Sequence, residues 1–207
     1  MSSKKPLIVF EGIEGSGKTT LINFVSNYLK KNKISFIKIR EPGGNPNSEL
    51  IRKLILNKKN KFNSFTDLML YFASRSENIE NIIKKNYKKK IIILDRFTDS
   101  TIAYQHYGMG LNINLIKSIN KLLLREIKPS KVFLNIISMK ILKKRLKMRK
   151  KKNRYDNFKI NFYNKVQKGF IKISKDKKNY VIINSNDNLE QNKKIILNEM
   201  LKLIKRW

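Results

Sequence analysis

The sequence predicts a doubly wound α/β domain, with a five-stranded parallel sheet flanked by helices. Short apolar runs rich in β-branched residues alternate with longer helical patterns along the 207 residues, the order typical of βαβ units. Four of the five runs are dense in Ile, Val, Leu or Phe, as strands buried on both faces should be. Motifs with glycine, acid or arginine follow the runs, at the sheet edge where such folds bind ligands.

The elements follow one another without a linker or internal repeat, so a single domain is expected over residues 1–207. The expected strands are 7–10, 35–39, 90–94, 131–136 and 179–183. The expected helices are 18–31, 48–56, 66–85, 113–126, 139–150 and 188–205. A further helix is expected to open near Ser100, after the third strand.

The composition is strongly basic, with 47 Lys and Arg against 15 Asp and Glu and a net charge of +32. A nucleic-acid surface is one interpretation of such charge. The basic residues extend from Lys4 to Arg206, whereas a binding patch should be local. We therefore favour a compositional bias and expect no nucleic-acid partner, although the charge would steer anionic substrates toward the protein.

The chain contains no cysteine, which excludes disulfides, Cys-ligated metals and thiol catalysis. No apolar run approaches the roughly 20 residues needed to span a bilayer. The N-terminal residues lack the long apolar segment of a secretory signal. We therefore expect a cytoplasmic protein with no membrane partner.

A phosphate-binding loop separates the first strand from the first helix. It satisfies G-x-x-x-x-G-K-[ST] and comprises Gly12, Ile13, Glu14, Gly15, Ser16, Gly17, Lys18 and Thr19, followed by Thr20. Glycines let backbone N–H groups converge on phosphates, and the helix N-terminus adds partial positive charge. Lys18 should reach the β- and γ-phosphates, and the Thr19 hydroxyl should ligate Mg²⁺. The loop predicts nucleoside triphosphate binding and phosphoryl transfer.

An acid and two arginines stand at the ends of the second and third strands. Asp95 follows four apolar residues, where a P-loop protein places its Mg²⁺-side carboxylate, although an Asp can also cap the next helix. Arg40 and Arg96 offer two planar forks for the phosphate of an acceptor. For Arg40 the alternative is a salt bridge on the rim with Glu41 or Glu49.

Two later segments carry groups that suit a nucleotide. Tyr71 and Arg75 are four residues apart and share a helix face, where they could stack a nucleobase and bond its edge. A core aromatic beside a surface arginine is the more common explanation of such a pair. Ser100, Thr101 and Gln105 would supply hydroxyl and amide groups to the same cavity, although helix capping explains Ser100 equally well.

One segment between the fourth and fifth strands is almost continuously basic. It runs from Lys143 to Lys152 and is followed by Asn153, Arg154, Tyr155 and Asp156. Such a segment is too charged to pack fully. Charge alone leaves two interpretations open, a mobile basic flap and a solvated helix end.

Together, four blocks of the chain resemble bacterial thymidylate kinases. They are F-E-G-I-E-G-S-G-K-T-T at 10–20, R-E-P-G-G at 40–44, Y-F-A-S-R at 71–75, and D-R-F with S-T-x-A-Y-Q at 95–105. They stand in the family's order and spacing, and the similarity covers essentially the whole chain. The second and fourth blocks are much more specific than the first.

The resemblance implies a P-loop nucleotide kinase fold with a basic lid at about residues 143–157. The implied reaction is in-line transfer of the γ-phosphoryl group of ATP to the 5′-phosphate of dTMP, giving dTDP. Mg²⁺ would assist, near Thr19 and Asp95. Members of the family are usually homodimers that pack helices together, so a homodimer is expected.

The resemblance also implies how dTMP would bind. Arg40 and Arg96 would hold its phosphate. Tyr71, in a place where the family usually has Phe, would stack on thymine. Arg75 would bond the exocyclic oxygen of the base.

The remaining implied contacts concern the ring edge and the sugar. Thr101 and Gln105 would read the ring-nitrogen edge of the base, with Ser100 beside them. Tyr104 would press on the place of a ribose 2′-hydroxyl and so favour deoxyribose. Glu14 would approach the 3′-hydroxyl of the acceptor.

The loop departs from family members that carry a catalytic arginine inside it, because Gly15 and Ser16 occupy that part. The resemblance therefore moves the transition-state charge to the lid. The lid candidates are Arg145, Arg149 and Arg154, and Arg149 is the preferred one. With Lys18, Asp95 and Arg96, the lid residues Arg149 and Arg154 complete the expected catalytic set.

The lid departs from the family pattern as well. Asn153 replaces the usual Asp, which puts the ion pairing inside the lid in doubt, and lysines 150–152 suit either substitute contacts or a degraded lid. Three other functions remain alternatives: a nucleoside or nucleotide kinase for another acceptor, a nucleic-acid-dependent ATPase, and a non-catalytic nucleotide-binding relic.

Overall fold

The structure is a computed structural model that describes residues 5–149 and 153–204. Its centre is a five-stranded, all-parallel sheet in the order β2-β3-β1-β4-β5. The strands are β1 Leu7–Gly12, β2 Phe36–Arg40, β3 Ile91–Asp95, β4 Lys131–Ile136 and β5 Tyr180–Asn184. The fold class predicted from the sequence is confirmed, because each strand lies within two residues of its expected bounds.

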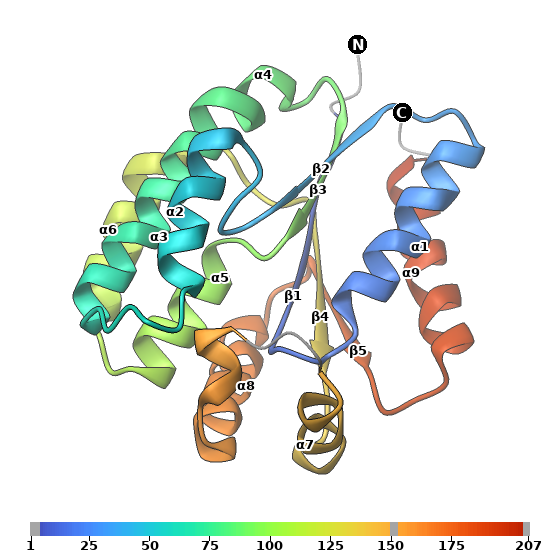
Figure 1. Cartoon of the computed structure of the whole chain (residues 1–207). Coiled ribbons are helices and arrows are strands. Elements are labelled where there is room, and N and C mark those ends of the chain that lie inside the picture. Colours follow the sequence, from blue (N-terminus) through green and yellow to red (C-terminus); the bar gives the residue numbers. More distant parts are fainter. Residues whose placement is uncertain (1–4, 150–152, 205–207) are drawn as a thin grey trace.

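Helices cover both faces of this sheet (Figure 1). The α-helices are α1 Lys18–Lys31, α2 Pro46–Leu56, α3 Ser64–Asn78, α4 Lys84–Asn86, α5 Thr98–Thr101, α6 Ile113–Leu124, α7 Met139–Lys147, α8 Ile160–Ser174 and α9 Leu189–Ile204. The described residues also form two π-helical stretches, η1 Ile79–Ile83 and η2 Ile102–Gly108, and a 3-10 turn, η3 Arg154–Asn157. In Figure 1, α1 and α9 lie on one side of the sheet, and α2, α3 and α6 lie on the other.

Strand β1 is the centre of the core and is buried along its whole length. Alternate side chains face opposite helix layers. Ile8 and Phe10 pack in the cluster that includes α1 and α9, whereas Leu7 and Val9 pack with Ile79 of η1. Burial on both faces explains why the strands read as continuous apolar runs in the sequence.

The strand register brings the motif residues to one edge of the sheet. Asp95 lies level with Phe10 on one side and with Arg40 on the other. Gly12 lies level with Asn135 of β4. Because parallel strands end at the same edge, the phosphate-binding loop, Asp95 and Arg40 meet there.

Some expected helices differ from the observed ones. The expected helix 66–85 is α3, η1 and α4 in direct succession. The helix expected over 113–126 ends at Leu124, since Arg125 has the left-handed φ of 48°. The ends expected at residues 150 and 205 lie outside the described residues, and α7 already stops at Lys147.

Helix α8 was not predicted. Its buried residues Tyr163, Val166 and Phe170 do recur at helical spacing. Gly169, however, lowers helix propensity by about 1 kcal/mol relative to alanine. A Cβ at Gly169 would lie 2.6 Å from the Tyr107 ring, so a tertiary contact with η2 explains the glycine. Among the described residues, the structure contains no helix long and apolar enough to cross a membrane.

Candidate functional site

A cavity of about 1120 Å³ opens at the carboxyl edge of the sheet. Most of the residues predicted for the site line it: Glu14, Gly15, Ser16, Gly17, Lys18, Thr19, Thr20, Arg40, Tyr71, Arg75, Asp95, Arg96, Ser100, Thr101, Tyr104, Gln105 and Arg149. Gly12 and Ile13 are buried beneath this lining. Arg154 is not among the lining residues, and its contacts are described with the lid below.

The phosphate-binding loop fits closely against its neighbours. A Cβ on Gly12, where φ is +136°, would lie 2.4 Å from the Asn135 carbonyl oxygen. Lys18 folds back over the loop, and its Nζ donates to the carbonyl oxygens of Gly12 at 2.8 Å and Ile13 at 2.9 Å. Burial, and then the neighbouring charge of Arg96, lower the pKa of Lys18 to about 8. The loop thus holds a buried amine whose charge an anionic ligand would stabilise.

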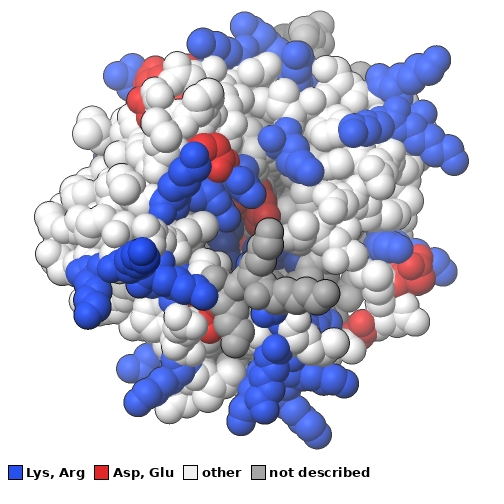
Figure 2. All heavy atoms as spheres, in the orientation of Figure 1, with Lys and Arg blue, Asp and Glu red and all other residues white. Residues whose placement is uncertain are grey.

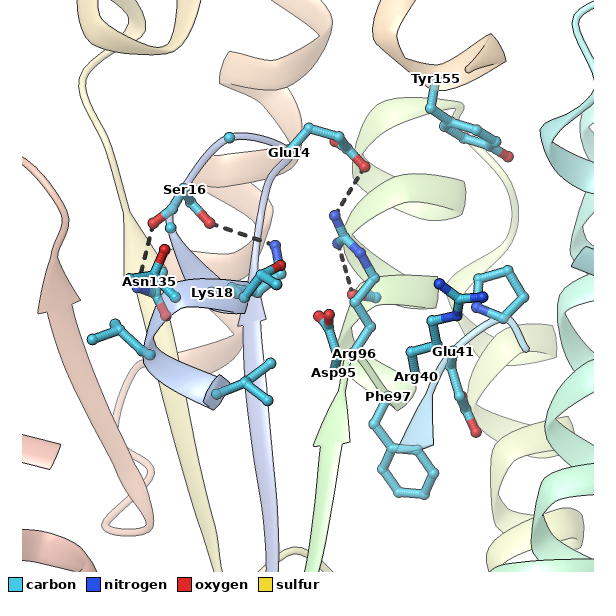
Figure 3. A pocket seen from close by; sticks show the side chains of 18 of the residues that line it. Glu14, Ser16, Lys18, Arg40, Glu41, Asp95, Arg96, Phe97, Asn135 and Tyr155 are labelled. Carbon is cyan, nitrogen blue, oxygen red and sulfur yellow. Dashed lines mark hydrogen bonds and ion pairs between the residues drawn. The ribbon is translucent and has the colours of Figure 1, made fainter. Parts of the chain in front are cut away.

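Arg96 is held in a strained turn directly opposite Glu14. Its φ is 72°, a conformation that costs a non-glycine residue on the order of 1–3 kcal/mol. Its Nη2 donates to Glu14 Oε1 at 2.8 Å, and Figure 3 shows the guanidinium directed toward that carboxylate. Its Nη1 donates to the Gly12 carbonyl oxygen at 2.9 Å and to Ser100 Oγ at 3.2 Å. The Tyr104 ring lies 5.1 Å from the guanidinium carbon, and the Tyr104 hydroxyl donates to Glu14.

Glu11 anchors this turn and was not singled out from the sequence as a site residue. Its Oε1 accepts from the backbone N–H groups of Phe97 at 2.9 Å and Ser100 at 3.2 Å, and its Oε2 accepts from Ser100 Oγ at 2.5 Å. Burial, reinforced by the charge of Asp99, raises its pKa to about 7. The available signal was an acid inside the otherwise apolar first strand.

Arg40 forms the rim ion pair that the sequence left open. Its Nη2 lies 3.0 Å from Glu49 Oε2, and its side chain is 54% exposed. Glu49 also accepts from the Gly44 N–H at 2.9 Å, and this fixes the turn after β2. Arg40 still lines the cavity, so the rim pair and a phosphate-facing position are compatible.

Arg75 is buried, so the surface-arginine alternative is wrong. Its side chain is 2% exposed, and its Nε donates to Glu41 Oε2 at 2.8 Å. Its Nη1 donates to Asn120 Oδ1 at 2.9 Å, and its Nη2 to the Phe97 carbonyl oxygen at 3.0 Å and Thr101 Oγ1 at 2.9 Å. These bonds use four of the five guanidinium donors, so Arg75 fixes the wall of the cavity.

Gln105 carries an unused donor in the same wall. The residue is 1% exposed. Its Nε2 has no hydrogen-bond partner in the part of the chain that the structure describes. An unpaired buried amide is costly unless a ligand supplies the acceptor, so the site suits a ligand with an acceptor on its edge.

The lid arginines face different directions. Arg145 donates from Nη1 to the Gly15 carbonyl oxygen at 2.8 Å and from Nη2 to the Ser185 carbonyl oxygen at 3.3 Å. Arg149 pairs with Asp156, and both Arg145 and Arg149 line the cavity. Arg154 pairs instead with Asp67 of α3, at 2.5 Å.

The doubt about ion pairing inside the lid is resolved by Asp156. Asp156 pairs with Arg149 and also accepts from the Asn153 backbone N–H at 2.7 Å. The Asn153 side chain accepts from the Tyr155 N–H at 2.8 Å and completes a capping box for η3. Asn153 therefore works as a cap rather than as a charge. Lysines 150–152 lie outside the described residues.

Sequence reasoning also missed Asn135 and Arg52, whose side chains join distant segments. Asn135 Nδ2 donates to the Ser16 carbonyl oxygen at 3.3 Å, and Ser185 Oγ donates to the same oxygen at 2.6 Å. Arg52 donates to the Pro42 carbonyl oxygen at 2.6 Å. A polar residue inside the apolar run of β4 was the only local signal for Asn135, and Arg52 belongs to no motif.

A family model described as thymidylate kinase matches residues 10–196 of the chain. The chain belongs to the thymidylate kinase family. A thymidylate kinase of Sulfurihydrogenibium sp. is 38% identical over 196 residues, covering 93% of this chain and 95% of that protein. One of Wolbachia pipientis is 41% identical over 171 residues, covering 81% and 84%.

A solved structure gives the same result for the fold. The crystal structure of thymidylate kinase from Ehrlichia chaffeensis superposes with a TM-score of 0.77 and 31% identity, covering 96% of this chain and 99% of that chain. Thymidylate kinases are phosphotransferases that convert dTMP to dTDP with ATP. The family and the reaction class that the sequence predicted are therefore confirmed.

Proposed function

We propose that this chain transfers the γ-phosphoryl group of Mg-ATP in line to the 5′-phosphate of dTMP, in nucleotide biosynthesis. One observation carries the proposal: a single cavity joins the Lys18 loop to the buried Gln105 amide with its unpaired donor. A triphosphate at one end and a base at the other would place two phosphates between them. The acceptor phosphate is already a nucleophile, so positioning and charge neutralisation supply the catalysis.

At the donor end, the loop Gly12–Thr20 would hold the triphosphate. Lys18 would turn from its carbonyl partners to the β- and γ-phosphates. The Thr19 hydroxyl and the Asp95 carboxylate both line the cavity, and one hydroxyl and one carboxylate fit Mg²⁺, which takes its other ligands from water and phosphate. Bound Mg²⁺ would neutralise phosphate charge. Arg145 and Ser185 mark the adenine side.

At the acceptor end, Arg96 and Arg40 would hold the dTMP phosphate, with Ser100 supporting Arg96. Glu14 and Tyr104, which bond each other beside Arg96, would face the sugar. The pair would contact the 3′-hydroxyl and occupy the space of a ribose 2′-hydroxyl.

The base would lie against Tyr71, whose ring lines the cavity. Gln105 and Thr101 would read its ring-nitrogen edge, and the remaining donor of Arg75 would bond its exocyclic oxygen. Arg75 and Thr101 already bond each other, so this edge is preorganised. Preorganised donors discriminate strongly against a base that cannot pair them.

The lid, about residues 143–157, would close over the transferring phosphate and exclude water. Arg149 lines the cavity and is 43% exposed, so it has the freedom to reach the transition state. Arg145 would hold the phosphate-binding loop. We infer one domain over residues 1–207 and a cytoplasmic location.

We further propose a homodimer. Helices α2, α3 and α6 share one side of the sheet (Figure 1) and expose large apolar side chains: Leu50 at 59%, Leu54 at 48%, Phe65 at 52% and Leu122 at 74%. Pairing of two such faces would remove this surface from water. Light scattering should report a dimer, and Leu122→Asp should shift it to monomer, whereas Ile171→Asp on α8 should not. A monomeric parent protein would contradict the proposal.

A nucleic-acid-dependent ATPase is the alternative from a different class. Figure 2 shows Lys and Arg spread over the visible face rather than gathered in one patch. This distribution supports a compositional bias. ATP hydrolysis that DNA or RNA stimulates would favour the alternative instead.

The test of the main proposal is a coupled assay with dTMP, dUMP, dGMP and AMP as acceptors. We expect dTMP to give the highest kcat/KM, followed by dUMP, which lacks only the methyl group. A preference for AMP or dGMP would overturn the assignment of the base site.

A further inference from the structure

Asp67 on α3 holds two consecutive residues of the lid. Its Oδ1 accepts from Arg154 Nη2 at 2.5 Å, and its Oδ2 accepts from the Tyr155 hydroxyl at 3.4 Å. The side chains of Arg154 and Asp67 are 17% and 6% exposed. The Arg154 guanidinium carbon also lies 5.9 Å from the Phe62 ring and 5.3 Å from the Tyr155 ring. These contacts occupy Arg154, which is not among the residues that line the cavity.

The same contacts set the position of Tyr155 inside the cavity. Tyr155 is 3% exposed and lines the cavity, and Figure 3 labels it among the lining residues. Its ring lies edge-on to Tyr71 and to Tyr104, with centroids 6.1 Å apart in both pairs. Asp67 and Tyr71 share one face of α3, four residues apart. The lid thus meets both rings that the proposed acceptor would contact.

A short turn held by a capping box connects this contact to the other lid arginine. Arg154 begins η3, and Asp156 lies two residues later. Asp156, whose side chain is 1% exposed, pairs with Arg149 and closes the capping box. The capping box therefore links the Arg154–Asp67 ion pair to the Arg149–Asp156 ion pair through one turn. We expect a displacement of α3 at Asp67 to be passed on to Arg149 by this route.

We propose that the ion pair between Asp67 and Arg154 acts as a latch. It positions Arg149 when the acceptor occupies its side of the cavity. Arg154 is then a positioning residue, and Arg149 is the lid arginine that reaches the phosphates. The proposal rests on the acceptor site described above, since Tyr71 must contact the base for the acceptor to act on α3.

The test is a double-mutant cycle on Arg154→Ala and Asp67→Asn, with kcat, KM for dTMP and thermal unfolding measured for each variant. A latch predicts that each single change lowers kcat by about 10²-fold, the order expected for a misplaced catalytic group. The double variant should be no slower than the slower single variant. Lys144→Ala, an exposed lid cation outside the cavity, is the matched control and should leave kcat unchanged.

Two further variants separate positioning from phosphate contact. Arg154→Lys keeps one donor for Asp67 and should recover most of kcat, and the exchanged pair D67R/R154D should recover part of it. The latch is overturned if the fold-losses of kcat in the two single variants multiply in the double variant. It is also overturned if Arg154→Lys has as low a kcat as Arg154→Ala while Asp67→Asn keeps the kcat of the parent protein. The kcat values are compared among variants whose thermal unfolding temperature equals that of the parent protein.

A wrong assignment of the acceptor site would give a different result from a wrong latch. Binding of dTMP alone, measured by calorimetry, should weaken about 10-fold or more in Tyr71→Ala, on the scale of a lost base–aromatic stack. Unchanged binding there would overturn the acceptor assignment. If the kcat losses multiply in the double-mutant cycle while Tyr71→Ala weakens dTMP binding as expected, only the latch is overturned.

Discussion

The acceptor wall and the lid both supply arginine to one cavity, but they hold it in opposite ways. Arg75 in the wall is 2% exposed and makes four hydrogen bonds. Arg149 in the lid is 43% exposed and forms an ion pair with Asp156. The wall is preorganised during folding, whereas the lid keeps a charge that can move. Recognition of a base needs fixed donors, and stabilisation of a transient charge needs a group that arrives on closure.

The largest expected effect concerns the lid, which carries the exposed arginine. Arg149→Ala should lower kcat by about 10³-fold, the scale for losing an arginine that stabilises a phosphoryl-transfer transition state. KM for dTMP should change little, because the wall is untouched. Steady-state kinetics with Lys144→Ala as the control will measure this. A loss confined to KM would place Arg149 in substrate binding instead.

A change in the preorganised wall should lower the stability of the protein. Arg75→Ala leaves the buried Glu41 carboxylate without its cation, which should lower the free energy of unfolding by about 3–5 kcal/mol. Burial already raises the pKa of Glu41, so Glu41→Gln in the same chain should restore part of the loss. Denaturant unfolding measures both. A loss below about 1 kcal/mol would show that the wall is not preorganised by this pair.

A smaller effect should separate recognition from folding within the wall. Gln105→Leu removes an amide whose Nε2 has no partner among the described residues, so thermal stability should be preserved. The kcat/KM for dTMP should fall by about 10- to 100-fold, which corresponds to roughly 1–3 kcal/mol. The acceptor assay and a thermal melt suffice. A destabilised but fully active variant would contradict the assigned role.

The smallest effect concerns the amine of the phosphate-binding loop. Burial lowers the pKa of Lys18 to about 8, so the nucleotide-free protein loses stability as the pH falls from about 10.5 to 8. An anionic triphosphate should raise that pKa again. At pH 8, binding of ATP should then take up about half a proton more in the parent protein than in Lys18→Met, as calorimetry in two buffers would measure. An equal proton uptake in the two proteins would contradict the lowered pKa of Lys18.

How much the sequence could predict differs between these regions. The loop Gly12–Thr19 and the acid Asp95 are adjacent to their strands, so local spacing was enough to place them. For Arg75 the sequence left a surface position open as the more common alternative, because its partners Glu41 and Asn120 are 34 and 45 residues away. Helix α8 was missed because its Gly169 makes sense only once Tyr107 is packed against it.

The sequence by itself determined the parallel sheet, the phosphate-binding loop and the family, because these follow from periodicity and from motifs of adjacent residues. Only the tertiary structure decided the partner of each charge. Arg40 pairs with Glu49, Arg149 with Asp156, and Arg154 with Asp67. A lone arginine does not reveal in the sequence whether it will meet a carboxylate or a phosphate. That choice depends on which distant helix the fold brings within about 3 Å of the guanidinium.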